Sequence, residues 1–116
     1  MALPVALQLY SVRDELEADF EGTIAKVRKF GYDGVEFAGL YGRSAEQVRK
    51  ILADAGLTPV SAHVPLDELL GDTQAVVATY KEIGCKYIVV PYLPEDRRPG
   101  TEGFDRTIED IKKIAD

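Results

Sequence analysis

Three similar stretches decide the fold of this chain: GYDGVEF at residues 31–37, GLTPVSAHV at 56–64 and GCKYIVVPY at 84–92. Each begins with a glycine that ends a helical pattern and continues into a run typical of a β-strand. A further strand pattern, at residues 5–10, precedes them. The chain therefore contains four strand–helix units of about 29 residues, close to the roughly 31 residues per unit of an eight-unit parallel barrel.

Four helical patterns follow the strand patterns, with apolar residues at every third or fourth position. The expected strands cover residues 5–10, 34–38, 58–64 and 87–92. The expected helices cover residues 19–30, 44–55, 72–83 and 101 onward. Ser44 with Gln47 forms a capping-box pattern, and Asp72 is the expected cap of the third helix. Phe30 and Val77 lie on the apolar sides of their helices, so we expect both to be buried.

Strands that alternate with helices of this size predict a parallel sheet, either open and doubly wound or one half of a barrel. The third strand carries Ser61 and His63 on one side, against an apolar side formed by Val60, Ala62 and Val64. The first two strands also pair one apolar side with one small or polar side. Inner strands of a doubly wound sheet are apolar on both faces, so this pattern favours a half-barrel with helices outside.

Composition limits the classes of function. The 116 residues include 20 acidic and 14 basic side chains, for a net charge of −6, which disfavours nucleic acid as a partner. No apolar run approaches the roughly 20 residues of a membrane helix, and the first residues lack a signal-peptide pattern. The single cysteine, Cys85, excludes an internal disulfide and follows a helix-ending glycine, where we expect inert packing. We therefore expect a cytoplasmic protein without membrane contact.

Polar and aromatic residues recur near the carboxyl ends of the strands, where the active site of a parallel barrel lies. They are Gln8, Tyr10, Glu36, His63 and Tyr92, with spacings of 28 (8 to 36), 27 (36 to 63) and 29 (63 to 92). Glu36 lies within an apolar strand, where burying an unpaired carboxylate costs free energy. We therefore expect Glu36 to act as a base, a substrate ligand or a partner of a metal ligand. His63 would be a metal ligand, a proton carrier or a hydroxyl partner. The two tyrosines would form walls of a sugar-sized pocket.

Arginines lie in the segments that follow the first and fourth strands. Arg13 is a candidate for holding a phosphate or carboxylate of a substrate. Arg97 and Arg98 adjoin Glu95 and Asp96, so we expect them to form a solvated loop face. The chain contains no glycine-rich dinucleotide motif, Walker loop, zincin motif or serine-hydrolase motif.

The stretches LQLYSVRDEL, FGYDGVEFAGLYG, GLTPVSAHVPLDEL and GCKYIVVPYLPE together resemble the sugar phosphate isomerase/epimerase family of xylose isomerase-like barrels, which includes inosose dehydratases. The resemblance implies a TIM barrel and metal-assisted proton transfer on a sugar, sugar phosphate or polyol. It implies a divalent metal, Mn, Mg, Zn or Co, in the complete enzyme. It places Glu36 and His63 near the substrate and metal. For an enzyme of this class we expect Glu36 and His63 to be catalytic, with His63 a candidate metal ligand. From their positions near the strand ends, we expect Gln8, Tyr10, Arg13 and Tyr92 to bind the substrate.

In that family most metal ligands and the proton-transferring glutamates lie on strands five to eight. We therefore expect residues 1–116 to form a single (βα)₄ half-barrel domain that lacks those strands, with an incomplete metal site and little or no activity of its own. A half-barrel exposes both edge strands and its lumen face, so we expect a homodimer or a swapped oligomer.

Two other functions remain open from the sequence. One is a non-catalytic half-barrel module that assembles as a homodimer. The other is a small doubly wound signalling domain of the receiver type, which needs an acidic cluster after the first strand. The sequence has Leu9, Tyr10 and Ser11 there, which disfavours that function.

Overall fold

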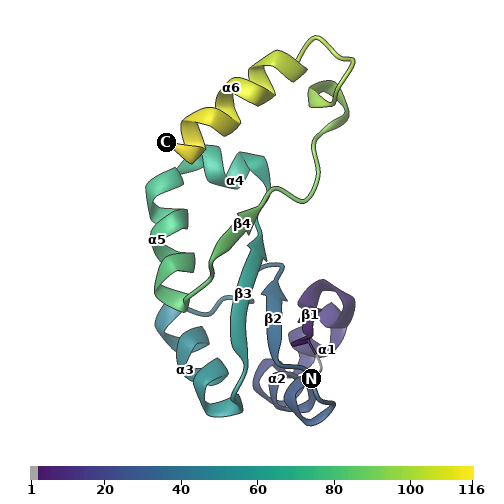
Figure 1. Ribbon diagram of the computed structural model, residues 1–116, viewed down its shortest axis with the longest axis vertical. Helices are drawn as coiled ribbons and strands as arrows, with labels where there is room; N and C mark the ends of the chain where they lie inside the picture. The colour runs from purple at the N-terminus through teal and green to yellow at the C-terminus, as the bar shows by residue number, and fades with distance from the viewer. Residues whose placement is uncertain (1–2) are drawn as a thin grey trace.

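A computed structural model describes residues 3–116, which form one parallel sheet of four strands in the order β1-β2-β3-β4 (Figure 1). The strands are β1 (Ala6–Gln8), β2 (Gly34–Phe37), β3 (Thr58–His63) and β4 (Tyr87–Val89). The α-helices are α1 (Arg13–Ala18), α2 (Phe20–Lys29), α3 (Ala45–Ala55), α4 (Leu66–Gly71), α5 (Thr73–Ile83) and α6 (Phe104–Ala115). Two 3₁₀ turns, η1 (Leu9–Val12) and η2 (Glu95–Arg97), follow β1 and precede α6.

The two faces of the sheet differ in their cover. The outer face packs under the helices, and its side chains Val35, Phe37 and Ala62 are fully buried. The inner face carries Gln8 and Glu36, which are only half-buried. The radius of gyration is 15.6 Å, whereas a compact domain of this length would have about 13 Å. The sheet is therefore open, with helices on one side, as half of a barrel requires.

All four strands are shorter in the structure than in the sequence pattern, β1 and β4 by the most. β1 ends at Gln8, because the chain turns into η1, so Tyr10 is not on a strand as predicted. Leu9, the first residue of this turn, is completely buried in the core. β4 ends at Val89, so Tyr92 also lies beyond its strand.

The helix caps are as predicted. Ser44 Oγ accepts from the Gln47 amide, and the Gln47 side chain accepts from the Ser44 amide, completing the capping box of α3. The Asp72 carboxylate accepts from the Ala75 amide at the start of α5. The predicted burial of Phe30 and Val77 is wrong: Phe30 is the exposed cap residue after α2, and Val77 lies beside an open groove.

Two short helices were not predicted. α1 and α4 each occupy the segment between a strand and its main helix, and each ends at an aspartate that caps the next helix. Leu16 of α1 and Leu69 of α4 are buried in the core. With six residues each, these helices are too short to give a clear periodic signal, and the packing of their buried leucines stabilises them.

A β-bulge determines which side chains of β3 reach the inner face. Val35 pairs with Pro59 but Glu36 pairs with Ser61, so Val60 is an extra residue in β3. A Cβ on Gly34 would lie 3.1 Å from Val60 Cγ2, so Val60 is on the inner side and not the outer side as predicted. Without the bulge, alternation would turn Ser61 and His63 toward the core. The bulge therefore places both of them beside Glu36.

The segment before α6 is anchored by Arg97. Its Nε donates to Thr107 Oγ1 at 3.0 Å, and its guanidinium also pairs with the Asp110 carboxylate. The expectation that Arg97 belongs to a solvated loop face is wrong, because Thr107 is fully buried and the ion pair is largely covered. This arginine serves packing, whereas Arg98 is exposed as expected.

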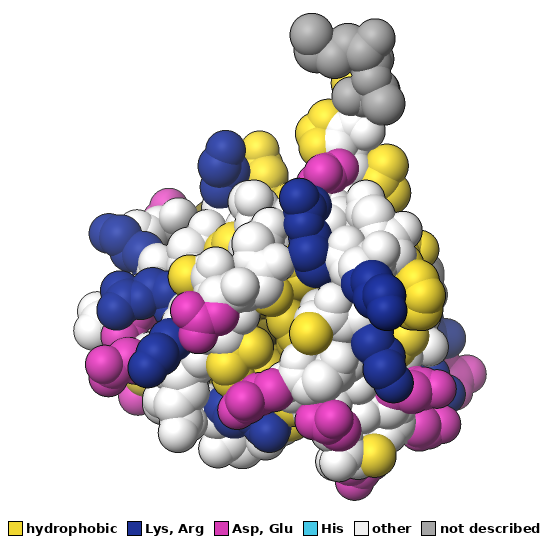
Figure 2. Space-filling view, turned by 90° about the horizontal axis from the view of Figure 1, so that it is seen from below, with side chains coloured by type: hydrophobic (Ala, Val, Ile, Leu, Met, Phe, Trp, Pro, Cys, Tyr) yellow, Lys and Arg dark blue, Asp and Glu magenta, His cyan; other side chains and the backbone are white. Residues whose placement is uncertain are grey.

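No helix within residues 3–116 is long and apolar enough to cross a membrane. The face at the amino ends of the strands shows Lys and Arg interspersed with Asp and Glu, with hydrophobic side chains between them (Figure 2). No histidine is visible on that face, since His63 ends β3 at the opposite end of the sheet.

Candidate functional site

Three neighbouring strands bring their polar residues into one row. Gln8 of β1 pairs with Glu36 of β2, and Glu36 pairs with Ser61 of β3. Residues in register on parallel strands point to the same face, so all three side chains lie on the inner face. His63 follows two positions after Ser61, on the same face and nearer the carboxyl end of β3.

These side chains form one continuous chain of hydrogen bonds. Gln8 Nε2 lies 3.1 Å from His63 Nδ1, and His63 Nε2 lies 2.9 Å from Glu36 Oε1. Ser61 Oγ donates to Glu36 Oε2 at 2.5 Å. One assignment satisfies every group: His63 Nε2–H donates to the carboxylate, and the free Nδ1 accepts from the Gln8 amide. Glu36 thus selects the Nε2–H tautomer and leaves Nδ1 as the basic nitrogen.

Both oxygens of the Glu36 carboxylate are therefore paired. The side chain is 25% exposed, and its position between Val35 and Phe37 would make an unpaired carboxylate costly. A carboxylate bonded to both an imidazole and a buried hydroxyl is fixed in one orientation. The arrangement matches the pairing of a base with the group that orients it.

A cavity of about 580 Å³ lies beside this hydrogen-bonded chain. Gln8 and His63 line it, while Glu36 lies behind His63. The other lining residues are Tyr10, Ala38, Gly39, Pro65, Glu68, Pro91 and Tyr92. Two predicted polar residues and both predicted tyrosines therefore meet at one cavity, although Tyr10 and Tyr92 lie in segments beyond their strands. Its size and mixed lining fit a small polar ligand.

Arg13 does not reach this cavity. It begins α1, where its guanidinium stacks at 4.3 Å over the Tyr10 ring and donates to the Tyr10 carbonyl oxygen at 3.0 Å. It lines an adjoining cavity of about 400 Å³ that shares Tyr10, Ala38 and Gly39 with the first. Arg13 therefore supports one wall of the main cavity.

Ser61 and Glu68 belong to the site but were not among the predicted site residues. Ser61 is 6% exposed and contacts Glu36, and its place two residues before His63 was the available signal. Glu68 lies on α4, a helix that the sequence pattern did not reveal. Its carboxylate adds a second acidic group at the cavity.

The residues of this site do not form a metal-binding set. Within residues 3–116, no three His, Cys, Asp or Glu side chains are grouped so that they could hold a metal ion. His63 and Glu36 offer two donors, and each already bonds the other. A catalytic zinc site takes three protein ligands, so the described residues do not provide a complete set of that kind.

Cys85 has no part in the site. It lies half-buried against the core, and burial raises the pKa of its thiol to about 11. The thiol therefore stays protonated near neutral pH, which agrees with the expected packing role.

Comparison with known proteins supports the fold. No family model matches the chain, and no curated protein gives a significant match. Two solved structures, each a sugar phosphate isomerase/epimerase from Parabacteroides distasonis ATCC 8503, superpose with TM-scores of 0.68 and 0.70. Their sequence identities are 22% and 20%, over 97% and 96% of this chain. The match covers 51% and 44% of those structures, so this chain spans about half of their length.

These likenesses confirm the predicted fold class. The chain has four successive βα units in the arrangement of half of a TIM barrel. The resemblance read from the strand-end motifs is confirmed at the level of structure, since both neighbours are isomerase/epimerase structures.

Proposed function

We propose that this chain supplies the sugar-binding and proton-transferring half of a cytoplasmic isomerase or epimerase that acts on a sugar or sugar phosphate. The observation that carries the proposal is the hydrogen-bonded chain from Gln8 through His63 and Glu36 to Ser61, beside the cavity of about 580 Å³. The fold shared with two sugar phosphate isomerases/epimerases supports the substrate class.

His63 is the proposed proton carrier. The anomeric hydroxyl of a cyclic sugar that replaces the Gln8 amide at Nδ1 would pass its proton to that nitrogen, while Nε2–H remains bonded to Glu36. The electron pair of the O–H bond would form the open-chain carbonyl as the bond from C1 to the ring oxygen breaks, and the ring oxygen would take a proton from water. The carboxylate would then stabilise the imidazolium that forms. Glu36 therefore acts through His63, and Ser61 keeps the carboxylate in the required orientation.

The remaining cavity residues are proposed to bind the substrate. The Gln8 amide, once displaced from Nδ1, offers two donors and one acceptor to neighbouring hydroxyls. Tyr10 and Tyr92 present ring faces and hydroxyls to the cavity, which suits the apolar and polar sides of a sugar. Arg13 would hold the Tyr10 wall in place through its stacking contact.

No step in this mechanism depends on a metal. A divalent ion in a complete enzyme would need ligands from beyond the described residues, because Glu36 and His63 provide too few. The ring opening described above needs only the His63 imidazole and water.

The test is ligand binding observed at the site by NMR. The chain is titrated with aldose, ketose and ketose phosphate ligands while the Gln8 side-chain amide and the His63 ring nitrogens are followed. We expect both residues to shift together in a saturable way, because both line the cavity. Inorganic phosphate and an aliphatic alcohol serve as ligand controls.

Gln8→Ala should weaken sugar binding several-fold, because it removes a hydrogen-bonding group from the cavity wall. Gln74→Ala is the matched control, since Gln74 is exposed on α5 away from the cavity. Sugars that leave both the Gln8 and His63 resonances unchanged, or equal effects of the two variants, would contradict the proposal.

A further inference from the structure

Both edges of the sheet are open. Within residues 3–116 the order is β1-β2-β3-β4, so strands β1 and β4 each pair on one side only, which leaves a row of backbone donors and acceptors on the other. Apolar side chains are exposed at both edges: Val5, just before β1, is 55% exposed, and Tyr87 of β4 is 64% exposed. Val89 is exposed beside Tyr87 on the inner face.

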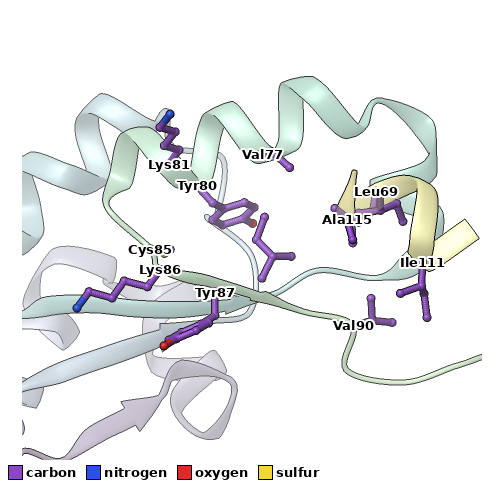
Figure 3. A pocket seen from close by; sticks show the side chains of 12 residues that line it. Leu69, Val77, Tyr80, Lys81, Cys85, Lys86, Tyr87, Val90, Ile111 and Ala115 are labelled. Atoms are coloured by element: carbon purple, nitrogen blue, oxygen red, sulfur yellow. The ribbon is translucent and has the colours of Figure 1, made fainter.

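An apolar groove of about 570 Å³ runs along the open edge of β4 (Figure 3). We call it the edge groove; it is lined by Val77 and Tyr80 from α5, Ile88 and Val90 from the β4 segment, and Ile111 and Ile114 from α6. Ile108 and Ile111 on the apolar side of α6 are each 38% exposed. α6 therefore presents apolar surface that no described residue covers.

We propose that a second copy of this chain fills the edge groove, with its β1 strand pairing in parallel with β4. The reciprocal pair, β4 of the second copy with β1 of the first, forms by the same contact. The two sheets then close into one eight-stranded barrel around a two-fold axis.

The direction of the strands favours this occupant over other pairings. All four strands are parallel, so joining the β1 edge of one copy to the β4 edge of another continues the sheet without reversal. Pairing β4 with β4 would be antiparallel and would leave both β1 edges open.

The side chains at the two edges are complementary. Leu7 pairs with Val35, whose side chain is buried on the outer face, so Leu7 points outward, and by alternation Val5 does too. Leu7 and Val5 of one copy would therefore enter the edge groove of the other copy, next to its Ile88 and Ile111. The inner face would be enclosed at the same time, covering Tyr87.

This inference goes beyond the proposed function and does not depend on it, because it follows from the sheet edges. Its consequence for the site is that two copies of the Glu36–His63 pair would face one lumen. Each copy has a net charge of −6, so the copies repel each other while their contact is apolar. Added salt should therefore strengthen the association, since it screens the repulsion.

Sedimentation equilibrium of the full chain, combined with amide hydrogen exchange, tests the proposal. We expect twice the chain mass at micromolar concentration, with amides of both β1 and β4 becoming protected as concentration rises. A monomer at these concentrations would overturn the proposal. A dimer in which only β4, or neither edge strand, gains protection would overturn it as well.

Two variants place a charge in the contact. Val5→Asp and Ile111→Asp should each raise the dimer dissociation constant by about tenfold or more, because a carboxylate would be buried without a partner. Leu70→Asp is the matched control: Leu70 is 38% exposed, like Ile111, but does not line the edge groove. An unfolding curve of each variant tests whether its monomer is still folded. Equal weakening by Leu70→Asp would contradict the assigned contact.

Discussion

The contact between Ser61 and Glu36 should stabilise the fold as well as the site. Ser61→Ala removes a buried hydroxyl that donates to the Glu36 carboxylate at 2.5 Å. A hydrogen bond to a charged group contributes about 1.5–3 kcal/mol. Because Glu36 is 25% exposed, water can replace part of this bond, so we expect a loss near the lower end of that range.

A loss of about 1.5 kcal/mol corresponds to a fall in Tm of about 6 °C for a chain of this length, given roughly 2.1 cal/mol/K of unfolding entropy per residue. Thermal unfolding and urea unfolding by circular dichroism both measure it. Ser11→Ala is the control, since Ser11 is exposed in η1 and should change stability by less than about 0.5 kcal/mol.

A double-mutant cycle shows whether the loss comes from the carboxylate. In a Glu36→Leu background Ser61 has no charged acceptor, so Ser61→Ala should cost at least about 1 kcal/mol less than in the native chain. Losses of the same size in both backgrounds would refute the reasoning, because the effect would then come from packing and not from the hydrogen bond.

Three further outcomes follow from the structure. Gly34→Ala should lower the free energy of unfolding by about 1–3 kcal/mol, because a Cβ would lie 2.6 Å from the Thr58 carbonyl oxygen. The control is Gly71→Ala, which has open space around it and should change the free energy of unfolding in urea by less than about 1 kcal/mol. The hydrogen bond from Arg97 lowers the pKa of Asp110 below its usual 3.8. This pair therefore stabilises the fold above about pH 4, and the stabilisation is lost as pH falls. Asp110→Asn should reduce the difference in unfolding free energy between pH 7 and pH 3, measured with urea. Adding Mn²⁺ or Zn²⁺, or removing metals with a chelator, should leave Tm unchanged, because the described residues lack a group of three metal ligands. A saturable rise in Tm would contradict this expectation, since Glu36 and His63 alone would not explain it.

Much of the fold was predictable because its signals are local. Glycines at the helix ends, the Ser44–Gln47 capping box and the alternation within the strands each depend on a few neighbouring residues. The prediction failed where local signals were short or ambiguous. Phe30 fits the helical spacing but follows the last turn of α2, where it faces solvent.

The candidate site was predictable in part for a similar reason. Parallel strands of similar length bring their carboxyl ends together, so equal spacing placed Gln8, Glu36 and His63 on one rim. Ser61 was missed because its importance lies in one contact with Glu36, between residues 25 positions apart. The environment of Arg97 was predicted wrongly because its partner, Asp110, lies 13 residues later in the sequence, within α6.

By itself, the sequence determined the four βα units, the polar inner side of the strands and the residues that end them. Those properties follow from side-chain periodicity and from glycine and cap residues, which act over a few positions. Only the tertiary structure decided that a bulge at Val60 turns His63 toward Glu36, and that the Gln8 amide meets Nδ1 across 55 residues. Register between strands depends on how whole elements pack against each other, and no short stretch of sequence contains that information.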